Sequence, residues 1–229
     1  MKKDKQGCDG KTCLLCRLSM SEWGTAIALH RKNFVLRKNE VLFREGERVT
    51  GIYFIYEGVV KVHKHWGSDK ELIVRFAGPG DIVGHRGIGG TEPIFPVSAT
   101  TLSSVRVCFF EMDFFQSSLR VNQELLYALM LFYAQELQTS EKQIRNLAHM
   151  PVKGRCATAL LLLEKLFGRS DDGFIHLSLS KQDLASYIGT TYETIFRILN
   201  EFISENLIII SGKSIRIVNE KGLLSYTEA

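Results

Sequence analysis

The stretch SKQDLASYIGTTYETIFRILNEF, residues 180–202, carries two short helix patterns in succession. Ser180 with Asp183 and Thr190 with Glu193 each fit the capping pattern in which a hydroxyl and a carboxylate satisfy backbone N–H groups at a helix start. Two capping signals in so short a stretch predict two consecutive helices with a tight turn between them.

The second helix pattern has one apolar face and one polar face. Gly189 marks the end of the helix before it, because glycine turns left-handed at little cost. Five apolar side chains recur at helical spacing and are predicted to pack inward: Ile195, Ile198, Leu199, Phe202 and Ile203. Tyr192, Glu193, Phe196 and Arg197 fall on the other face, near the helix N-terminus. In helix-turn-helix docking, that end meets base edges in the major groove.

The flanking residues extend this pattern to a winged helix-turn-helix. A strand-like segment, residues 176–179, precedes the two helices. After them, the β-rich runs 207–210 and 215–218 flank a turn at residues 212–213, which predicts a hairpin, the wing. The order strand, helix, turn, helix, hairpin favours a DNA-reading module over two unrelated amphipathic helices.

Composition describes a globular chain of about two domains. Of its 229 residues, 45% are hydrophobic and 24% charged, and no apolar run is long enough for a signal peptide or a membrane span, so we expect a cytoplasmic protein without membrane contact. The net charge is +4, but residues 151–229 contain nine basic and nine acidic residues. DNA binding must therefore rely on a local patch of cations: Lys153, Arg155, Lys181, Arg197, Lys213 and Arg216.

Residues 33–111 consist of short β-rich runs separated by glycine turns, which predicts a sandwich or small barrel. The seven runs are 41–43, 52–56, 59–65, 72–76, 82–83, 97–101 and 105–110.

The segment 114–149 contains neither proline nor glycine and predicts one helix of about 50 Å. Six of its residues follow the alternating three and four spacing of a two-stranded coiled coil: Met130, Tyr133, Leu137, Ser140, Ile144 and Leu147. This stripe predicts a homodimer. The alternative is that it packs on the barrel of its own chain.

A glycine-punctuated barrel, a long helix and a winged helix-turn-helix together resemble the Crp/Fnr family of bacterial transcription regulators, from about residue 23 to residue 218. Four stretches carry the resemblance: Phe43-Arg44-Glu45-Gly46-Glu47, Gly80-Asp81-Ile82-Val83-Gly84, Gly154-Arg155 and the E-T-x-x-R pattern within Tyr192-Glu193-Thr194-Ile195-Phe196-Arg197-Ile198-Leu199.

The resemblance implies an α+β fold class with four parts. A cysteine-containing N-terminal segment, 1–20, precedes a double-stranded β-helix, a cupin-like jelly-roll barrel that forms the sensor domain over 21–113. A dimerisation helix over 114–149 and a winged helix-turn-helix DNA-binding domain over 150–229 follow. The implied partners are double-stranded DNA with a palindromic site, a second copy of the chain and RNA polymerase.

Carried over to this sequence, the resemblance implies that Glu193 and Arg197 approach base edges, glutamate suiting cytosine N4 and arginine suiting guanine O6 and N7. Phe196 either contacts a thymine methyl or packs inward beside the wing. The full set of expected DNA contacts is Ser180, Thr191, Tyr192, Glu193, Phe196, Arg197 and Lys213.

The barrel departs from the members of the family that bind a cyclic nucleotide. His85 stands where those members have a ribose-binding glutamate, and Val97 where they have a phosphate-binding arginine. A cyclic phosphate would lack its charge-assisted partner, so we do not expect cyclic AMP as the effector. Arg86 with Gly87, Gly89 and Gly90 could form an anion-holding loop, although ordinary turns explain the same glycines.

Cys8, Cys13 and Cys16 cluster near the N-terminus in C-x4-C-x2-C spacing, and Cys108 stands at the end of a barrel strand. Clustered thiolates in a cytoplasmic chain suit soft metal centres, and iron–sulfur clusters take four such ligands. Cys156 lies in an apolar helix run and is predicted to be buried. Three interpretations stay open: an iron–sulfur cluster, a zinc site with the same four ligands, or no metal.

The Fnr branch of the family, which the cysteines resemble, holds a 4Fe-4S cluster with three N-terminal cysteines and one from the barrel. Cys108 occupies the position of that barrel cysteine. The N-terminal spacing differs from the best-known pattern and also opens plant-type 2Fe-2S sites, so the cluster type stays open, with 4Fe-4S favoured. Destruction of the cluster by oxygen or nitric oxide is the expected signal.

The main alternative is a regulator of the same build whose barrel binds another small ligand or haem, the cysteines being incidental or zinc-binding. An enzyme is not expected, because the sequence shows no nucleophile and base, or pair of carboxylates, at a persuasive spacing.

Overall fold

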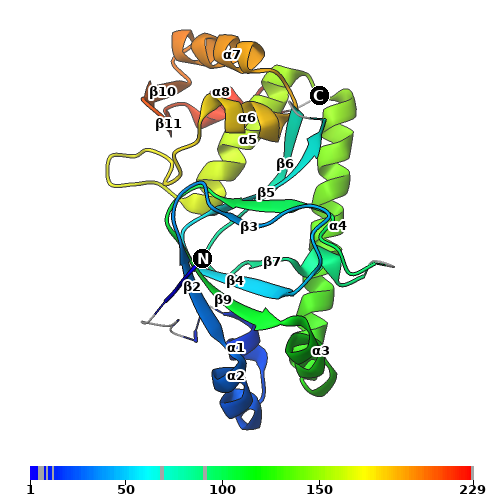
Figure 1. The fold of residues 1–229 in the computed structure, drawn as a ribbon. Helices are drawn as coiled ribbons and strands as arrows, with labels where there is room; N and C mark the ends of the chain where they lie inside the picture. Colours follow the sequence, from blue (N-terminus) through cyan, green and yellow to red (C-terminus); the bar gives the residue numbers. More distant parts are fainter. Residues whose placement is uncertain (5–7, 9, 12, 68–69, 90–91, 228–229) are drawn as a thin grey trace. The chain divides into compact units, whose positions relative to one another are not determined.

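The computed structural model describes residues 1–4, 8, 10–11, 13–67, 70–89 and 92–227. The chain divides into two compact units, 1–64 with 74–137 and 65–73 with 138–229 (Figure 1). Among the described helices, none combines the length and the apolar character needed to cross a membrane.

Two mostly antiparallel sheets make up the barrel. The five-stranded sheet has the order β1-β2-β9-β4-β7 and the four-stranded sheet the order β3-β8-β5-β6. The strands are β1 (Lys2–Lys3), β2 (Lys32–Leu36), β3 (Val41–Phe43), β4 (Gly51–Glu57), β5 (Val60–Trp66), β6 (Lys70–Ala77), β7 (Ile82–Val83), β8 (Ser98–Thr101) and β9 (Val105–Glu111). All seven predicted runs form strands, and β1 and β2 add to them.

Strands β4 and β9 have an apolar core on each face, as alternation along a strand allows. Tyr53 and Phe109 belong to the core inside the barrel, where the rings of Phe43 and Phe95 stack with centroids 4.0 Å apart. Phe54 and Phe110, which directly follow Tyr53 and Phe109, belong to a second core on the outer face of the five-stranded sheet.

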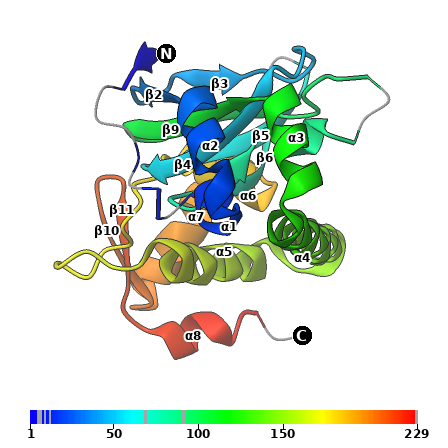
Figure 2. The same ribbon diagram turned by 90° about the horizontal axis from the view of Figure 1, so that it is seen from below.

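Short helices cover this outer face of the five-stranded sheet (Figure 2). They are α1 (Leu14–Leu18), η1 (Ser21–Trp23), α2 (Gly24–His30) and α3 (Met112–Val121), followed by the first turns of α4 (Gln123–His149). A further 3-10 helix, η2 (His85–Gly87), follows β7. Of these, α1, η1 and α2 were not predicted from the sequence.

The prediction of one continuous helix over 114–149 is wrong, because α3 and α4 are separated by Asn122. This residue has an extended backbone (φ −111°, ψ 90°) and is buried. Its side-chain amide donates to the Ser118 carbonyl at 2.8 Å, and its side-chain oxygen accepts from the Met20 backbone N–H at 2.7 Å. Tertiary hydrogen bonds to the N-terminal segment thus fix a break that no proline or glycine announces.

The C-terminal unit contains the predicted winged helix-turn-helix. Its elements are α5 (Val152–Phe167), α6 (Lys181–Ile188), α7 (Tyr192–Ser204), β10 (Ile208–Ser211), β11 (Ser214–Ile217) and α8 (Glu220–Leu224). Ser180 caps α6 by accepting from the Asp183 N–H at 3.0 Å, and Gly189 ends α6 with φ 73°, both as predicted. The predicted hairpin is present, with Ile208 opposite Ile217.

The cap of α7 is Thr191 rather than the predicted Thr190. The Thr191 hydroxyl accepts from the Thr194 N–H at 3.3 Å. Thr190 belongs to the turn, where its N–H donates to the Ala185 carbonyl at 3.1 Å. The left-handed glycine therefore places the second helix one residue later than the capping pattern indicated.

Two smaller predictions about this unit are also wrong. Residues 176–179 form no strand, although the chain meets the wing on both sides of residue 176. The Ile175 N–H donates to the Ile215 carbonyl at 2.8 Å, and the Ser178 and Ser214 hydroxyls lie 3.2 Å apart, before the chain leads into the Ser180 cap. Ile203 is 40% exposed, because it lies one step around α7 from a stripe that is already complete. The other four predicted inward residues of α7 are buried.

Candidate DNA-binding face and cysteine site

The four residues predicted to face DNA, Tyr192, Glu193, Phe196 and Arg197, are all exposed on α7. The rings of Tyr192 and Phe196 stack with centroids 6.4 Å apart, and the Lys181 ammonium lies 5.8 Å from the Phe196 ring. Phe196 is 46% exposed, so the alternative in which it packs inward beside the wing is wrong. The N-terminal end of α7 thus presents an aromatic pair beside Glu193 and Arg197.

Three of the six cations expected to form a phosphate-facing patch have partners within the chain. Lys153 pairs with Glu205 at 2.7 Å. Arg155 donates to the Ile188 and Met150 carbonyls at 3.0 and 2.9 Å. The Arg216 guanidinium lies 5.3 Å from the centre of the Phe174 ring. Formal charge alone could not separate these residues from surface cations.

The other three cations lie on the helix-turn-helix and the wing. Arg197 and Lys213 are exposed. Ser180, Lys181 and Lys213 line one groove, which brings the start of α6 next to the turn of the wing. Arg197 and Lys213 are thus the most exposed of the six cations, and contact of the six with phosphate stays a prediction.

Most of the predicted dimer stripe on α4 is open to solvent in the single chain. Met130, Leu137 and Ile144 are 54%, 61% and 66% exposed, Leu147 is exposed, and Ser140 is half-buried. Tyr133 differs, because its hydroxyl donates to the His85 carbonyl at 2.5 Å and anchors α4 on the barrel. The alternative in which the stripe packs on the barrel of its own chain therefore holds only for Tyr133.

The four cysteines proposed as ligands come together at the outer core of the barrel. Cys108 lies on β9 and is buried with Phe54 and Phe110, while Cys13 precedes α1 and Cys16 lies within it. Together with Cys8 they form what we call the cysteine site. Cys13 and Cys108 are buried, and Cys8 and Cys16 are half-buried.

The four thiols lie close enough together to shift one another's ionisation. Interaction with Cys108 and Cys16 lowers the pKa of Cys8 to about 2 and that of Cys13 to about 4. Interaction with Cys13 and Cys8 raises the pKa of Cys16 and of Cys108. Four clustered thiols are a donor set that fits an iron–sulfur cluster or a tetrahedral zinc ion.

Two polar side chains border the cysteine site. Arg31 donates from Nη1 to the Cys8 sulfur at 3.3 Å, and Cys108 donates to the Asn33 side-chain oxygen at 3.2 Å. Asn33 lies directly opposite Cys108 in the pairing of β2 with β9. Cys156 does not belong to the site: it is buried in α5, and burial raises its pKa to about 12, as the prediction of a plain core residue requires.

Residues that follow the cysteine site connect it to the break between α3 and α4. Besides the Met20 bond to Asn122, the Trp23 indole N–H donates to the Ser118 hydroxyl at 2.9 Å. His30 stacks on Phe114 with ring centroids 4.2 Å apart. The segment that carries Cys13 and Cys16 is thus bonded to α3 and to Asn122, the residue that precedes α4.

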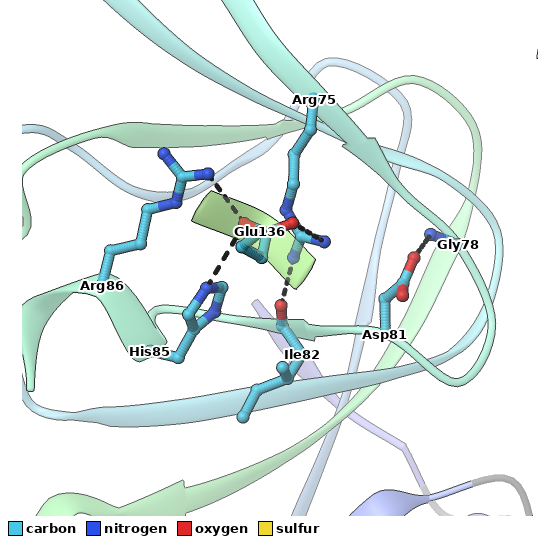
Figure 3. A network of polar contacts seen from close by, with 7 residues as sticks. All are labelled: Arg75, Gly78, Asp81, Ile82, His85, Arg86 and Glu136. Atoms are coloured by element: carbon cyan, nitrogen blue, oxygen red, sulfur yellow. Dashed lines mark hydrogen bonds and ion pairs between the residues drawn. The ribbon is translucent and has the colours of Figure 1, made fainter. Parts of the chain in front are cut away.

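A second polar group, the Glu136 cluster, consists of Arg75, His85, Arg86 and Glu136 (Figure 3). The Glu136 carboxylate on α4 pairs with Arg86 at 2.7 Å and Arg75 at 3.4 Å. Arg86 therefore does not hold an external anion in the loop considered above, of which Gly90 lies outside the described residues. Arg75 and Glu136 were not predicted as site residues, because each looks like an ordinary surface charge in the sequence.

Comparisons with known proteins agree with this build. The cyclic nucleotide-binding domain pattern matches residues 34–122, and the Crp-like helix-turn-helix domain pattern matches 154–226. The anaerobic regulatory protein of Haemophilus influenzae is 30% identical over 196 residues, which cover 84% of this chain and 75% of that protein. The chain belongs to the Crp/Fnr family. The relatives and domain patterns that match the chain are those of DNA-binding transcription regulators and not of enzymes.

Relatives within the Crp/Fnr family differ in their named signals. A CRP-like cAMP-activated global transcriptional regulator of Mycobacterium tuberculosis is 28% identical, with 81% of this chain and 84% of that protein covered. The structure of FixK2 from Bradyrhizobium japonicum shares the fold, with a TM-score of 0.77 at 24% identity over 87% of this chain and 98% of that one. Membership of the Crp/Fnr family therefore does not identify the effector of this chain.

Proposed function

We propose that this Crp/Fnr regulator responds to oxygen or redox state through an iron–sulfur cluster held by Cys8, Cys13, Cys16 and Cys108. The observation that carries the proposal is that three N-terminal thiols meet a barrel thiol far away in the sequence. When bound, the cluster would supply an oxygen-labile centre, of the 4Fe-4S type in preference to 2Fe-2S. The name of the Haemophilus relative, an anaerobic regulatory protein, supports a signal related to oxygen.

The residues of the chain provide a route from this site to α4. With the thiols engaged, α1 is held against β9, and Met20 is held where its N–H reaches Asn122. Loss of the shared centre would release α1 and weaken the bonds from Met20 to Asn122 and from Trp23 to Ser118. The start of α4 would then be free to shift, which is a switch by ordering and releasing a segment.

The active form in this proposal is a homodimer joined along α4. Met130, Leu137 and Ile144, spaced by seven residues, present an exposed apolar stripe suited to a two-stranded coiled coil. A two-fold dimer would place its recognition helices on palindromic half-sites about 34 Å apart.

DNA reading is assigned to the exposed end of α7 and its surroundings. Glu193 and Arg197 would contact cytosine and guanine edges, and the Tyr192 and Phe196 rings would flank them. Lys213, Lys181, Ser180 and Thr191 would lie toward the phosphates.

Purification without oxygen tests the proposed function. We expect a brown protein with stoichiometric iron and sulfide, which air bleaches and whose affinity for a palindromic operator changes on bleaching. A Cys156→Ala variant, changed at a cysteine outside the site, should behave the same way. A colourless protein with one zinc ion per chain, or with no metal, would contradict the proposal.

The alternative in which the barrel binds a small ligand or haem is less well supported. Aromatic rings take up part of the barrel interior, where Phe43 stacks on Phe95 with centroids 4.0 Å apart and on Tyr53 with centroids 5.8 Å apart. That alternative predicts that a Cys108→Ser variant keeps its signal response, whereas the cysteine proposal predicts that the response is lost.

A further inference from the structure

The Glu136 cluster joins three separate parts of the barrel unit. Arg75 comes from β6, His85 and Arg86 from η2, and Glu136 from α4 (Figure 3). The His85 ring nitrogen Nε2 faces the same carboxylate at 3.7 Å, and the second Arg75 nitrogen donates to the Ile82 carbonyl. Three cationic or polar side chains of the barrel therefore converge on one carboxylate from the helix.

The cations of the Glu136 cluster are largely buried, so losing the Glu136 carboxylate would destabilise the folded protein. The side chains of Arg75 and Glu136 are only 12% and 17% exposed, and His85 is 2% exposed. A buried charge that loses its partner destabilises a protein strongly. Asp81 lies near Arg75 and offsets part of its charge, but Arg86 still leaves an excess of positive charge on the barrel side.

The contacts around Glu136 hold α4 on the barrel. Next to it in the same helix, Tyr133 donates to the His85 carbonyl at 2.5 Å, and the Phe132 ring lies 5.5 Å from the Arg75 guanidinium. Leu137, which follows Glu136 directly, is 61% exposed in the apolar stripe. The carboxylate therefore fixes the rotation of α4 at the point where the stripe faces outward.

We propose that Arg75, His85 and Arg86 form an anion site of the barrel, specific for a carboxylate, and that Glu136 of the same chain is its permanent occupant. The helix thereby supplies from within the chain the negative charge that an external anionic ligand would otherwise bring. The link between barrel and α4 is then complete without an effector in the barrel, and a free carboxylate can enter only when the Glu136 side chain is absent.

Chemical rescue tests this assignment directly. In the full-length, metal-free protein, Glu136→Ala removes the occupant and leaves the barrel cations in place. We expect its melting temperature to fall by about 10 °C, as the loss of one partner of a buried ion pair implies. Acetate or formate should restore at least half of that loss, whereas chloride at the same ionic strength should not.

Matched variants separate the anion site from a general salt effect. Glu141→Ala removes an exposed carboxylate of the same helix and should neither lower the melting temperature nor respond to acetate. Glu136→Gln keeps the shape of the side chain without its charge and should be less stable than the wild type. Acetate should not rescue it, because the amide still fills the space. This variant replaces Glu136→Ala in the test if the alanine variant does not fold.

Two results would overturn the proposal: equal recovery of Glu136→Ala in acetate and chloride, or a Glu136→Gln variant as stable as the wild type. Because these measurements need neither iron nor DNA, their outcome is independent of the cysteine proposal.

Discussion

The cysteine site and the Glu136 cluster both attach helices to the barrel, but they reach completion in different ways. In the Glu136 cluster, Arg75 and Arg86 bind a carboxylate that the chain itself provides. In the cysteine site, four thiols lie together, and Arg31 and Asn33 are the polar side chains that hydrogen-bond to them. Folding alone supplies both charges of the Glu136 cluster. The cysteine site would need a metal centre to balance its thiolates, because thiolates bring no positive charge of their own.

The largest expected effect comes from breaking the cysteine site. Cys108→Ser should lower the iron bound after anaerobic purification by at least about tenfold, because the barrel ligand is the only one fixed in the sheet. Iron analysis beside absorption spectra measures this. Full iron content in Cys108→Ser, or a comparable loss in Cys156→Ala, would show that the ligands have been assigned wrongly.

The cysteine site could be predicted from the sequence more completely than the Glu136 cluster. The cysteine spacing is a local signal, and the family resemblance supplied its fourth member, Cys108. The Glu136 cluster depends on three elements meeting in space, and each of its charges read alone resembles a solvated surface residue. Arg86 was noticed only for the glycines beside it.

The difference between local and long-range signals also explains which helix ends could be predicted. The Ser180 cap and the Gly189 stop were predictable because both act on their own backbone. The break at Asn122 was not, since it depends on Met20, 102 residues earlier in the chain. Local chemistry could be read from the sequence, whereas partners brought by the fold could not.

The second prediction concerns the pH dependence of the Glu136 cluster. Burial opposes ionisation of Glu136, but bonds and charges from His85, Arg75 and Arg86 outweigh it and lower the pKa from 4.5 to about 2. A carboxyl with a lowered folded-state pKa stabilises the protein above its unfolded pKa and loses this effect as pH falls through the folded pKa. His85, whose pKa is lowered by burial, destabilises the folded state in the same acidic direction.

Wild type should therefore exceed Glu136→Gln in free energy of unfolding by about 3 kcal/mol above pH 5, with the difference shrinking between pH 5 and pH 2. Urea unfolding of the metal-free proteins across this range measures it. A difference that does not depend on pH would contradict the assigned role of the Glu136 charge.

A change on the reading helix should leave both sites intact. Arg197→Ala is expected to weaken operator binding by about 1 to 3 kcal/mol and to relax the preference for guanine at one position of each half-site. Binding assays with base-substituted operators measure both effects, and iron content and unfolding should stay at wild-type values. Unchanged affinity and base preference would remove Arg197 from the proposed base contacts.

The smallest expected effect concerns Arg31, the cation beside the cysteine site. Arg31→Met removes the hydrogen bond to the Cys8 sulfur and should leave the iron content unchanged while speeding bleaching in air by up to about tenfold, because the sulfur loses a donor that withdraws electron density. Arg17→Met, an exposed position on α1, serves as the control. Equal bleaching rates in the two variants would make Arg31 a bystander.

The most direct test of the central claim is native mass spectrometry of the anaerobically purified protein. The wild type should carry the added mass of one iron–sulfur cluster per chain, this mass should disappear after exposure to air, and Cys108→Ser should never carry it. A wild-type mass equal to that of the polypeptide alone, or increased by a single zinc ion, would show that the four cysteines do not hold an iron–sulfur cluster.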